Sequence, residues 1–314
     1  MIKKIIIDCD PGHDDAVAIM LAAANNKIEI IGITCVAGNS ILENTQLNAI
    51  KVCSLIGRRD IPIFAGEHKP IIFDLVTAAH VHGENGLAYD GSPIEIDNSH
   101  KVQDMHAVDF IIKSCHDQVE PIYLCSLGPL TNIALALQKD PSIKNKIKQI
   151  VFMGGAGLCL GNITPSAEFN IYVDPHAANI IFHSGVPLVM MGLDVTHKVN
   201  VNDQIIETIQ KNNNQASSFF ADLMRFYSKF HRKLYGVNES PLHDPCVIAY
   251  LIDPSIFTGK KVNVEVEENS SLTRGQTVVD WLGVTDRKAN CYVMVEANST
   301  KFFSLLETEL KKLN

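Results

Sequence analysis

The stretch IIIDCDPGHDDAVAIML, residues 5–21, crowds acidic side chains between two apolar runs. The run before them has strand length and is β-branched, and the run after them continues as a helical pattern. Pro11 and Gly12 supply a tight turn between the two runs. We therefore expect a first strand, a turn and a first helix, with four carboxylates gathered at the turn: Asp8, Asp10, Asp14 and Asp15.

Four more apolar runs of strand length follow, at residues 28–38, 121–128, 147–155 and 186–194, and longer helical patterns separate them. Each run is nearly continuous in apolar residues, which is typical of parallel strands covered on both faces. The alternation favours an α/β fold, namely a doubly wound, mainly parallel central sheet with surrounding helices. Because no internal repeat or linker interrupts the pattern, we expect a single domain over residues 1–314.

Start and stop signals delimit the helical patterns. Ser40 and Glu43 have the spacing of a capping box, and Gly57 ends the pattern that they begin. Asp174 and Pro175 predict the start of another helix, as its cap and first position. Residues 200–236 are helical in pattern but polar in places, which favours a helical cap outside the sheet core. Residues 300–313 are amphipathic and predict a surface helix at the end of the chain.

Composition argues against several classes of function. The 35 acidic and 27 basic residues give a net charge of -8, which is unfavourable for nucleic-acid binding by phosphate neutralisation. The eight cysteines form no CxxC pair and lie mostly in apolar runs, as buried free thiols of a reducing compartment do. Neither a signal peptide nor a run long enough to span a bilayer is evident. We therefore expect a cytoplasmic protein without nucleic-acid or membrane partners.

The acidic turn predicts a cation site. It follows a parallel strand, and crevices outside the carboxyl ends of such strands bind ligands in α/β proteins. Helix capping and the helix dipole explain Asp14 or Asp15 separately, but not four converging carboxylates. Like charges a few ångströms apart repel by roughly 1 kcal/mol per pair in water, and by more in a crevice. A hard divalent cation with oxygen ligands would offset this repulsion.

Other polar segments supply candidates for the same site. His243 and Asp244 precede an apolar helix, where an aspartate could bind a cation and a histidine could transfer protons. His82 lies on a Gly-rich loop of the kind that binds ligands, and Asn39 follows the second strand. Amides and a carboxylate without Lys or Arg suit sugar hydroxyls better than phosphate. The segment GNITPSAEFNIYVDP contains three such residues: Asn162, Glu168 and Asn170.

Taken together, these segments closely resemble the nucleoside hydrolases, or nucleoside N-ribohydrolases. The family signature DxDPGxDDA is present as DCDPGHDDA, and VAGN, HGENG, MGG, AEFNI and HDP follow in the family's order. The resemblance runs from Lys3 to the C-terminal helix. It implies the nucleoside hydrolase fold, nucleoside salvage or catabolism, and a homo-oligomer, with a tetramer expected. DCDPGHDDA, TPSAEFN and SGVPLVMMGLD are most similar to the branch that acts on uridine and cytidine.

The resemblance also implies a set of site residues. Those that match ligands of a Ca²⁺ ion are Asp10, Asp15, Asp244 and, through its backbone carbonyl, Leu127. Those that match contacts to the ribose hydroxyls are Asp14, Asn39, Glu168 and Asn170. Positions lining the sugar pocket are matched by Met153 and Asn162, and positions near the base by His82 and His243. His231 and Tyr235 could face the nucleobase, but His231 stands where the closest relatives would have an amide. The preference between pyrimidines and purines therefore stays open.

Hydrolysis of an N-glycosidic bond makes three demands on such a site. It needs a nucleophile from water, an environment for a cationic sugar, and help for the leaving base. A divalent ion can orient and acidify water, and Asp10 is expected to act as the general base. The carboxylates of Asp14 and Glu168 suit a cationic sugar, and His243 is expected to stabilise or protonate the leaving base. The other histidines, including His13 and His197, are expected to be surface or packed residues.

The sequence leaves two other functions open. A haloacid-dehalogenase-type phosphatase also places DxD after its first strand and uses Mg²⁺. Here, however, Gly12 stands where Thr or Val is usual, and the later Lys and paired acidic motif are not evident. A nucleoside- or sugar-binding protein without catalysis is the other alternative, and the presence of both Asp10 and His243 argues against it.

Overall fold

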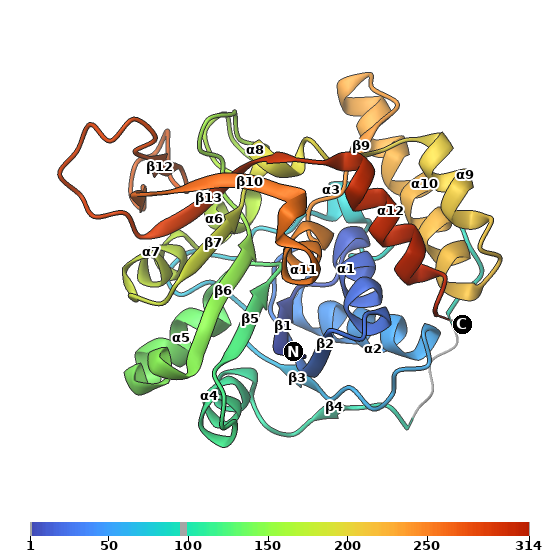
Figure 1. Cartoon of the computed structure of the whole chain (residues 1–314), viewed down its shortest axis with the longest axis horizontal. Coiled ribbons are helices and arrows are strands. Elements are labelled where there is room, and N and C mark those ends of the chain that lie inside the picture. Colours follow the sequence, from blue (N-terminus) through green and yellow to red (C-terminus); the bar gives the residue numbers. More distant parts are fainter. Residues whose placement is uncertain (1, 95–98, 314) are drawn as a thin grey trace.

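The computed structural model describes residues 2–94 and 99–313, and a large sheet forms its centre (Figure 1). Among the described residues the sheet has nine strands. In spatial order they are β10 (Phe257–Val262), β13 (Cys291–Ala297), β7 (Leu188–Met191), β6 (Ile147–Met153), β5 (Ile122–Ser126), β1 (Lys3–Cys9), β2 (Ile28–Cys35), β3 (Ile63–Ala65) and β4 (Val102–Gln103). Every neighbouring pair is parallel except β10 with β13. The predicted mainly parallel α/β sheet is confirmed.

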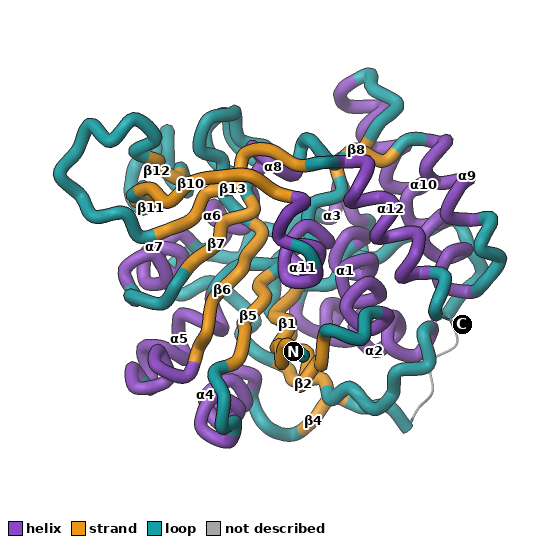
Figure 2. Tube along the Cα trace, viewed as in Figure 1, coloured by secondary structure: helices purple, strands orange, loops and turns teal. Residues whose placement is uncertain are grey.

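Helices cover both faces of this sheet, as Figure 2 shows. One face carries α1 (His13–Ala24), α2 (Leu42–Leu55), α11 (Pro245–Ile252) and α12 (Ser299–Leu310). The opposite face carries α4 (Ala107–Asp117), α5 (Thr131–Lys139) and α7 (Pro175–His183). The other described elements are α3 (Ala79–His82), α6 (Phe169–Val173), α8 (Leu193–Thr196), α9 (Asp203–Gln210), α10 (Gln215–Tyr235), the 3-10 helices η1 (Pro141–Lys146) and η2 (Pro254–Ile256), and the strand pairs β8 (Asn200–Val201) with β9 (Ser240–Pro241) and β11 (Val264–Val266) with β12 (Thr277–Val279).

The first strand shows why the apolar runs are continuous. Ile5 and Ile7 pack into the core shared with α1, whereas Ile6 packs into the core on the α4 and α5 side. A strand covered on both faces needs apolar side chains at successive positions. The five runs identified in the sequence all form strands of the sheet: β1, β2, β5, β6 and β7. That residues 1–314 form a single domain stays a prediction.

The predicted helix boundaries are confirmed at one cap and wrong at another. Asp174 accepts a hydrogen bond from the N–H of Ala177 at 3.0 Å and begins α7 as expected. Ser40, in contrast, does not cap α2, whose N-cap is Ile41. The Ser40 hydroxyl instead donates to the Glu84 carbonyl at 3.4 Å and accepts from Asn44 at 2.9 Å, so it is engaged elsewhere.

Residues 200–236 are mainly helical as predicted, but they do not form a cap outside the core. Phe220 and Leu223 of α10 are fully buried in the same core as α1. Figure 1 accordingly shows α10 alongside the α1 face of the sheet. This helix therefore forms part of the main body next to the first turn.

The sheet brings the polar segments to one edge. Cys9 at the end of β1 pairs with Cys35 at the end of β2. On the other side, Asp8 pairs with Ser126, the last residue of β5. The loops that continue from these parallel strands therefore leave the sheet side by side, and they include Asp10, Asn39 and Leu127.

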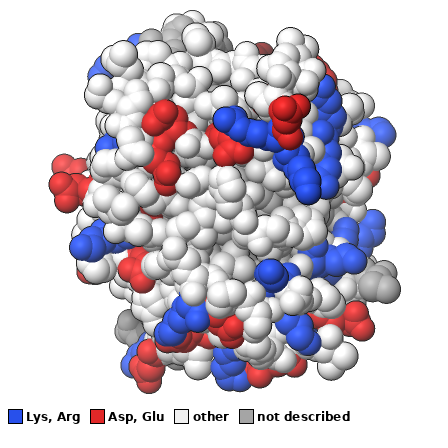
Figure 3. Space-filling view, turned by 90° about the vertical axis from the view of Figure 1, so that its left-hand side faces the viewer, with Lys and Arg blue, Asp and Glu red and all other residues white. Residues whose placement is uncertain are grey.

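The surface carries both signs of charge. On the face shown in Figure 3, Lys and Arg side chains are interspersed with Asp and Glu around a central area of other residues. Within residues 2–94 and 99–313, no helix is long and apolar enough to cross a membrane.

Candidate active site

The turn after β1 is closed by its own aspartate. The Asp15 carboxylate accepts hydrogen bonds from the backbone N–H groups of Gly12, at 2.9 Å, and Asp10, at 3.3 Å. This is the N-terminal capping expected of an aspartate three residues into a helix. It folds the turn back on itself and holds Asp10 next to the start of α1.

Two loops that contain glycine pack closely against Asp10. Its Oδ2 accepts the N–H of Asn39 at 2.6 Å, whereas its buried Oδ1 has no hydrogen-bond partner among the described residues. A Cβ atom at Gly38 would lie 2.1 Å from Oδ2, and one at Gly128 would lie 2.3 Å from Oδ1. Two loops thus approach the carboxylate closely and leave one oxygen available to an external group.

Three other carboxylates share a small space. Asp14, Asp15 and Asp244 each offer an oxygen within 4.8 Å of the others, and all three side chains are buried. Burial, followed by the charge of Asp15, raises the pKa of Asp14 to about 7. Burial also raises the pKa of Asp244 well above its usual range, with the neighbouring aspartates adding to the shift. Buried carboxylates this close are costly unless they are neutralised by protons or by a cation.

Glu168 and Asn170 build a wall from the loop after β6. Glu168 caps α6, because its oxygens accept the N–H groups of Asn170 at 3.0 Å and Ile171 at 3.3 Å. Asn170 donates its side-chain N–H₂ to the carbonyl oxygens of Leu127, at 2.8 Å, and Met153, at 3.2 Å. These bonds fix the wall to the ends of β5 and β6 and leave the Leu127 oxygen with a second lone pair.

Two histidines lie near this site, each paired with another side chain. His243 Nδ1 is 2.8 Å from the Thr196 hydroxyl at the end of α8. His82 Nδ1 is 2.9 Å from Nδ1 of His13. These contacts through Nδ1 orient both rings at the cavity, which both residues line.

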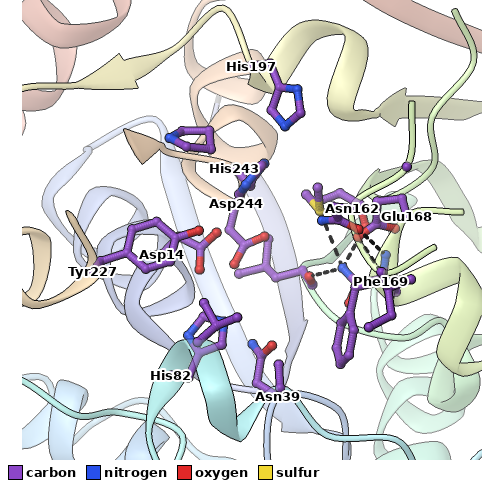
Figure 4. A pocket seen from close by; sticks show the side chains of 18 of the residues that line it. Asp14, Asn39, His82, Asn162, Glu168, Phe169, His197, Tyr227, His243 and Asp244 are labelled. Carbon is purple, nitrogen blue, oxygen red and sulfur yellow. Dashed lines mark hydrogen bonds between the residues drawn. The ribbon is translucent and has the colours of Figure 1, made fainter. Parts of the chain in front are cut away.

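These groups border a cavity of about 420 Å³. Figure 4 shows the carboxylates of Asp14 and Asp244 beside Asn39, with Tyr227 and Glu168 on opposite sides. Of the described residues, no Lys or Arg lines the cavity, which therefore offers carboxylates, amides and imidazoles to a ligand. Such a lining suits a neutral molecule rich in hydroxyls, or one that gains positive charge.

The family is shown by a sequence model described as inosine-uridine preferring nucleoside hydrolase, which matches residues 5–304. The chain belongs to this nucleoside hydrolase family.

Relatives of this nucleoside hydrolase cover nearly its whole length. The pyrimidine-specific ribonucleoside hydrolase RihA of Shigella boydii serotype 4 is 44% identical over 312 residues, covering 99% of each chain. A purine-preferring ribonucleoside hydrolase from Gardnerella vaginalis has a solved structure with a TM-score of 0.91 and 34% identity, covering 98% of each chain. A plant nucleoside hydrolase, PpNRh1, also has a TM-score of 0.91, with 32% identity, and the match covers 98% of this chain and 99% of that one.

The structure of this nucleoside hydrolase brings most of the predicted site residues together. Those lining the cavity are Asp14, Asn39, His82, Leu127, Met153, Asn162, Glu168, Asn170, His243 and Asp244. Asp10 and Asp15 do not line the cavity. Both accept hydrogen bonds from Asn39, which does line it. His231 and Tyr235 were also predicted to be site residues, but their side chains are not among those that the structure describes.

Several lining residues had no predicted role. Phe169 lies between Glu168 and Asn170 within the AEFNI segment, so its neighbours were the available signal. Tyr227 comes from the middle of α10, where no local motif marks it. His197, expected to be a surface or packed histidine, also lines the cavity, with its ring centroid 5.7 Å from that of His243.

The donor set fits a hard divalent cation. Every candidate ligand atom is an oxygen, and the buried Oδ1 of Asp10 lacks a protein partner among the described residues. The predicted set of cation ligands stays a prediction. The compact group contains Asp14, which was predicted to contact ribose, together with Asp15 and Asp244, whereas Asp10 is not one of the three.

Proposed function

We propose that this protein is a Ca²⁺-dependent hydrolase of the N-glycosidic bond of ribonucleosides, with uridine and cytidine preferred. Its products would be ribose and a free base, as in nucleoside salvage or catabolism. The observation that carries this proposal is that two of the three clustered carboxylates, Asp14 and Asp244, line the same cavity as Glu168 and Asn170. One cavity thus combines groups for a cation with groups for sugar hydroxyls.

Asp10, Asp15, Asp244 and the Leu127 carbonyl would hold the ion, with Asp14 close enough to join them or to bind ribose. A bound Ca²⁺ would orient the attacking water and the ribose hydroxyls, and it would lower the pKa of that water modestly. The all-oxygen donor set favours Ca²⁺ or Mg²⁺ over softer metals.

The protein groups supply the remaining steps. Asp10 is suited to take the proton of the attacking water, because its Oδ1 is not committed to a protein donor among the described residues. The carboxylates of Asp14 and Glu168 favour the positive charge that develops on the sugar as the bond to the base breaks. Asn39, Met153, Asn162 and Asn170 would position the ribose.

His243 would assist the leaving base. Its ring is buried at the cavity wall, and the bond from Nδ1 to Thr196 orients it. A histidine in this position can donate a hydrogen bond or a proton to the departing base, and its contribution is expected to be larger for purines than for pyrimidines. His82 would approach the base from the opposite loop, and His231 and Tyr235 remain proposed base contacts.

The proposed preference for pyrimidines is supported by one of the relatives. It follows from RihA, named as pyrimidine-specific and 44% identical to this chain. A purine-accepting or nonspecific hydrolase is the second candidate, favoured by the 34% identity to the purine-preferring Gardnerella enzyme. Steady-state rates on uridine, cytidine, inosine and adenosine decide between them. Cytidine and uridine should have the highest kcat/KM, and higher values for inosine and adenosine would favour the second candidate.

The reaction itself is tested by release of uracil with and without EDTA. The proposal expects hydrolysis that stops with EDTA and returns with Ca²⁺. Hydrolysis of p-nitrophenyl phosphate instead of any nucleoside would favour the phosphatase alternative, and ribose binding without turnover would favour a binding protein.

We also propose a cytoplasmic homo-oligomer, with a tetramer expected. All eight cysteines are free thiols and seven are buried, which supports a reducing compartment. Light scattering coupled to size-exclusion chromatography measures the subunit number, and a single-chain mass would contradict an oligomer.

A further inference from the structure

His13, the first residue of α1, connects three separate parts of the molecule. Its buried ring places Nε2 2.5 Å from the carbonyl oxygen of Ala88 and Nδ1 2.9 Å from Nδ1 of His82. The same ring stacks with Phe226 and Tyr227 of α10, with centroids 5.4 Å apart in each pair. One side chain therefore joins the first turn, the segment of residues 79–88 and the helix α10.

The segment of residues 79–88 folds tightly against the first turn. A Cβ atom at Gly12 would lie 2.6 Å from His82 Nδ1, so a larger residue there would displace the imidazole. Asn48 adds a second link, because its side-chain N–H₂ donates to the carbonyl oxygens of Pro11 at 3.0 Å and Asn85 at 2.8 Å. The position of His82 is thus set by the first turn and not only by its own short helix α3.

The contacts of His13 identify what it can do. A carbonyl oxygen only accepts, so Nε2 of His13 donates to Ala88, while Nδ1 is engaged with His82. Both ring nitrogens are thereby committed to protein atoms, and the residue is not among those lining the cavity. Its partners His82 and Tyr227, in contrast, do line the cavity and stack with each other at 6.0 Å.

We propose that His13 is a positioning residue that orients His82 and holds residues 79–88 against α10, so that the two form one wall of the cavity. This role rests on the proposed function in so far as the wall is taken to face the nucleobase. Without His13, the wall would lose two hydrogen bonds and a stacked ring at its centre, and the substrate would lose part of its alignment with Asp10.

The two hydrogen bonds can be separated by substitution. His13→Phe keeps an aromatic ring but removes both bonds. His13→Asn places an amide near the position of Nδ1, towards His82, and His13→Gln places one near Nε2, towards Ala88. His100→Phe is the matched control, because His100 is also buried and pairs through Nε2 with the Ile61 carbonyl at 3.0 Å, outside the cavity lining.

Hydrogen–deuterium exchange of the substrate-free protein tests the positioning directly. His13→Phe should speed exchange of the amides in residues 79–88 by about tenfold or more, while His100→Phe leaves that segment within about twofold of the wild type. His13→Gln, which can still bond to Ala88, should restore most of the protection. Unchanged exchange in residues 79–88 of His13→Phe would overturn the proposal.

Kinetics with uridine test the consequence for the site. At equal folded fraction, His13→Phe should lower kcat/KM by about 10- to 100-fold, with KM raised and kcat lowered. His13→Asn should recover more of kcat than His13→Gln, because it can still orient His82. Equal losses in His13→Phe and His100→Phe would show a general packing effect and overturn the positioning role. If the wild type hydrolyses no nucleoside, the proposed function fails, and the exchange measurement still decides the role of His13 in holding the segment.

Discussion

Gly128 lies so close to Asp10 that a larger residue at position 128 should displace the Asp10 carboxylate, and the structure gives the distance of this displacement. A Cβ atom at position 128 would lie 2.3 Å from Asp10 Oδ1, whereas real Cβ contacts are essentially never closer than 3.0 Å. Gly128→Ala must therefore shift the carboxylate by about 0.7 Å, the difference between these two distances. Because the backbone of Gly128 is not among the positive-φ glycines, an alanine there is not strained for conformational reasons.

We expect this shift to lower kcat by about 10- to 100-fold, because a displacement near 1 Å in a catalytic group can cost about a hundredfold. Asp10 is both the proposed base and a proposed ligand, so calcium affinity should fall as well. The assay is steady-state release of uracil from uridine at saturating Ca²⁺, with calcium affinity measured by isothermal titration calorimetry.

Gly57→Ala is the control for loss of stability. Its backbone has φ of +69° and a Cβ atom there would meet no atom within 4 Å, so alanine adds strain of about 1 kcal/mol without touching the site. This variant should keep wild-type kcat. Wild-type kcat in Gly128→Ala would refute the placement of Asp10 next to the reacting atoms.

Three further predictions concern separate parts of the structure. Calcium at a hundred times its Kd should stabilise the metal-free protein by about 2.7 kcal/mol, visible as a higher Tm, and an unchanged Tm would show that no ion binds the folded state preferentially. Thr196→Val should lower kcat for inosine more than for uridine, because it releases Nδ1 of His243, and equal losses on both substrates would count against a leaving-group role. Asp174→Ala should lower the free energy of unfolding by about 3 kcal/mol in urea denaturation, because its carboxylate accepts from Ala177, Ile71 and Thr131, and a loss below about 1 kcal/mol would contradict this.

The sequence was sufficient for the sheet because the strands are buried on both faces. Continuous apolar runs such as that of Ile5, Ile6 and Ile7 have few alternatives to a covered parallel strand. The cap at Asp174 was predictable because Asp followed by Pro is a local signal for the start of a helix. The wrong cap at Ser40 shows the limit, because the hydroxyl is used by a partner 44 residues away.

Some site residues are marked by a local sequence motif, whereas others reach the site only through contacts between distant segments. The turn at Asp10 and Asp15 was visible because four aspartates lie within a short stretch of sequence between two apolar runs. Tyr227 and His13 could not be assigned in this way. Their contact with each other depends on α10 packing beside the first turn, and such a contact between distant segments leaves no local sequence pattern.

The most direct test of a catalytic cation is whether uridine hydrolysis is lost when metal is removed and recovered when Ca²⁺ is returned. The protein is treated with chelator, assayed for uracil release, and assayed again after stoichiometric Ca²⁺ is returned, beside Asp244→Asn treated identically. We predict that the wild type loses activity and regains it, while Asp244→Asn regains little at the same calcium concentration. Full hydrolysis by the chelator-treated wild type, with its metal content shown to be negligible, would contradict a catalytic cation at the aspartate turn.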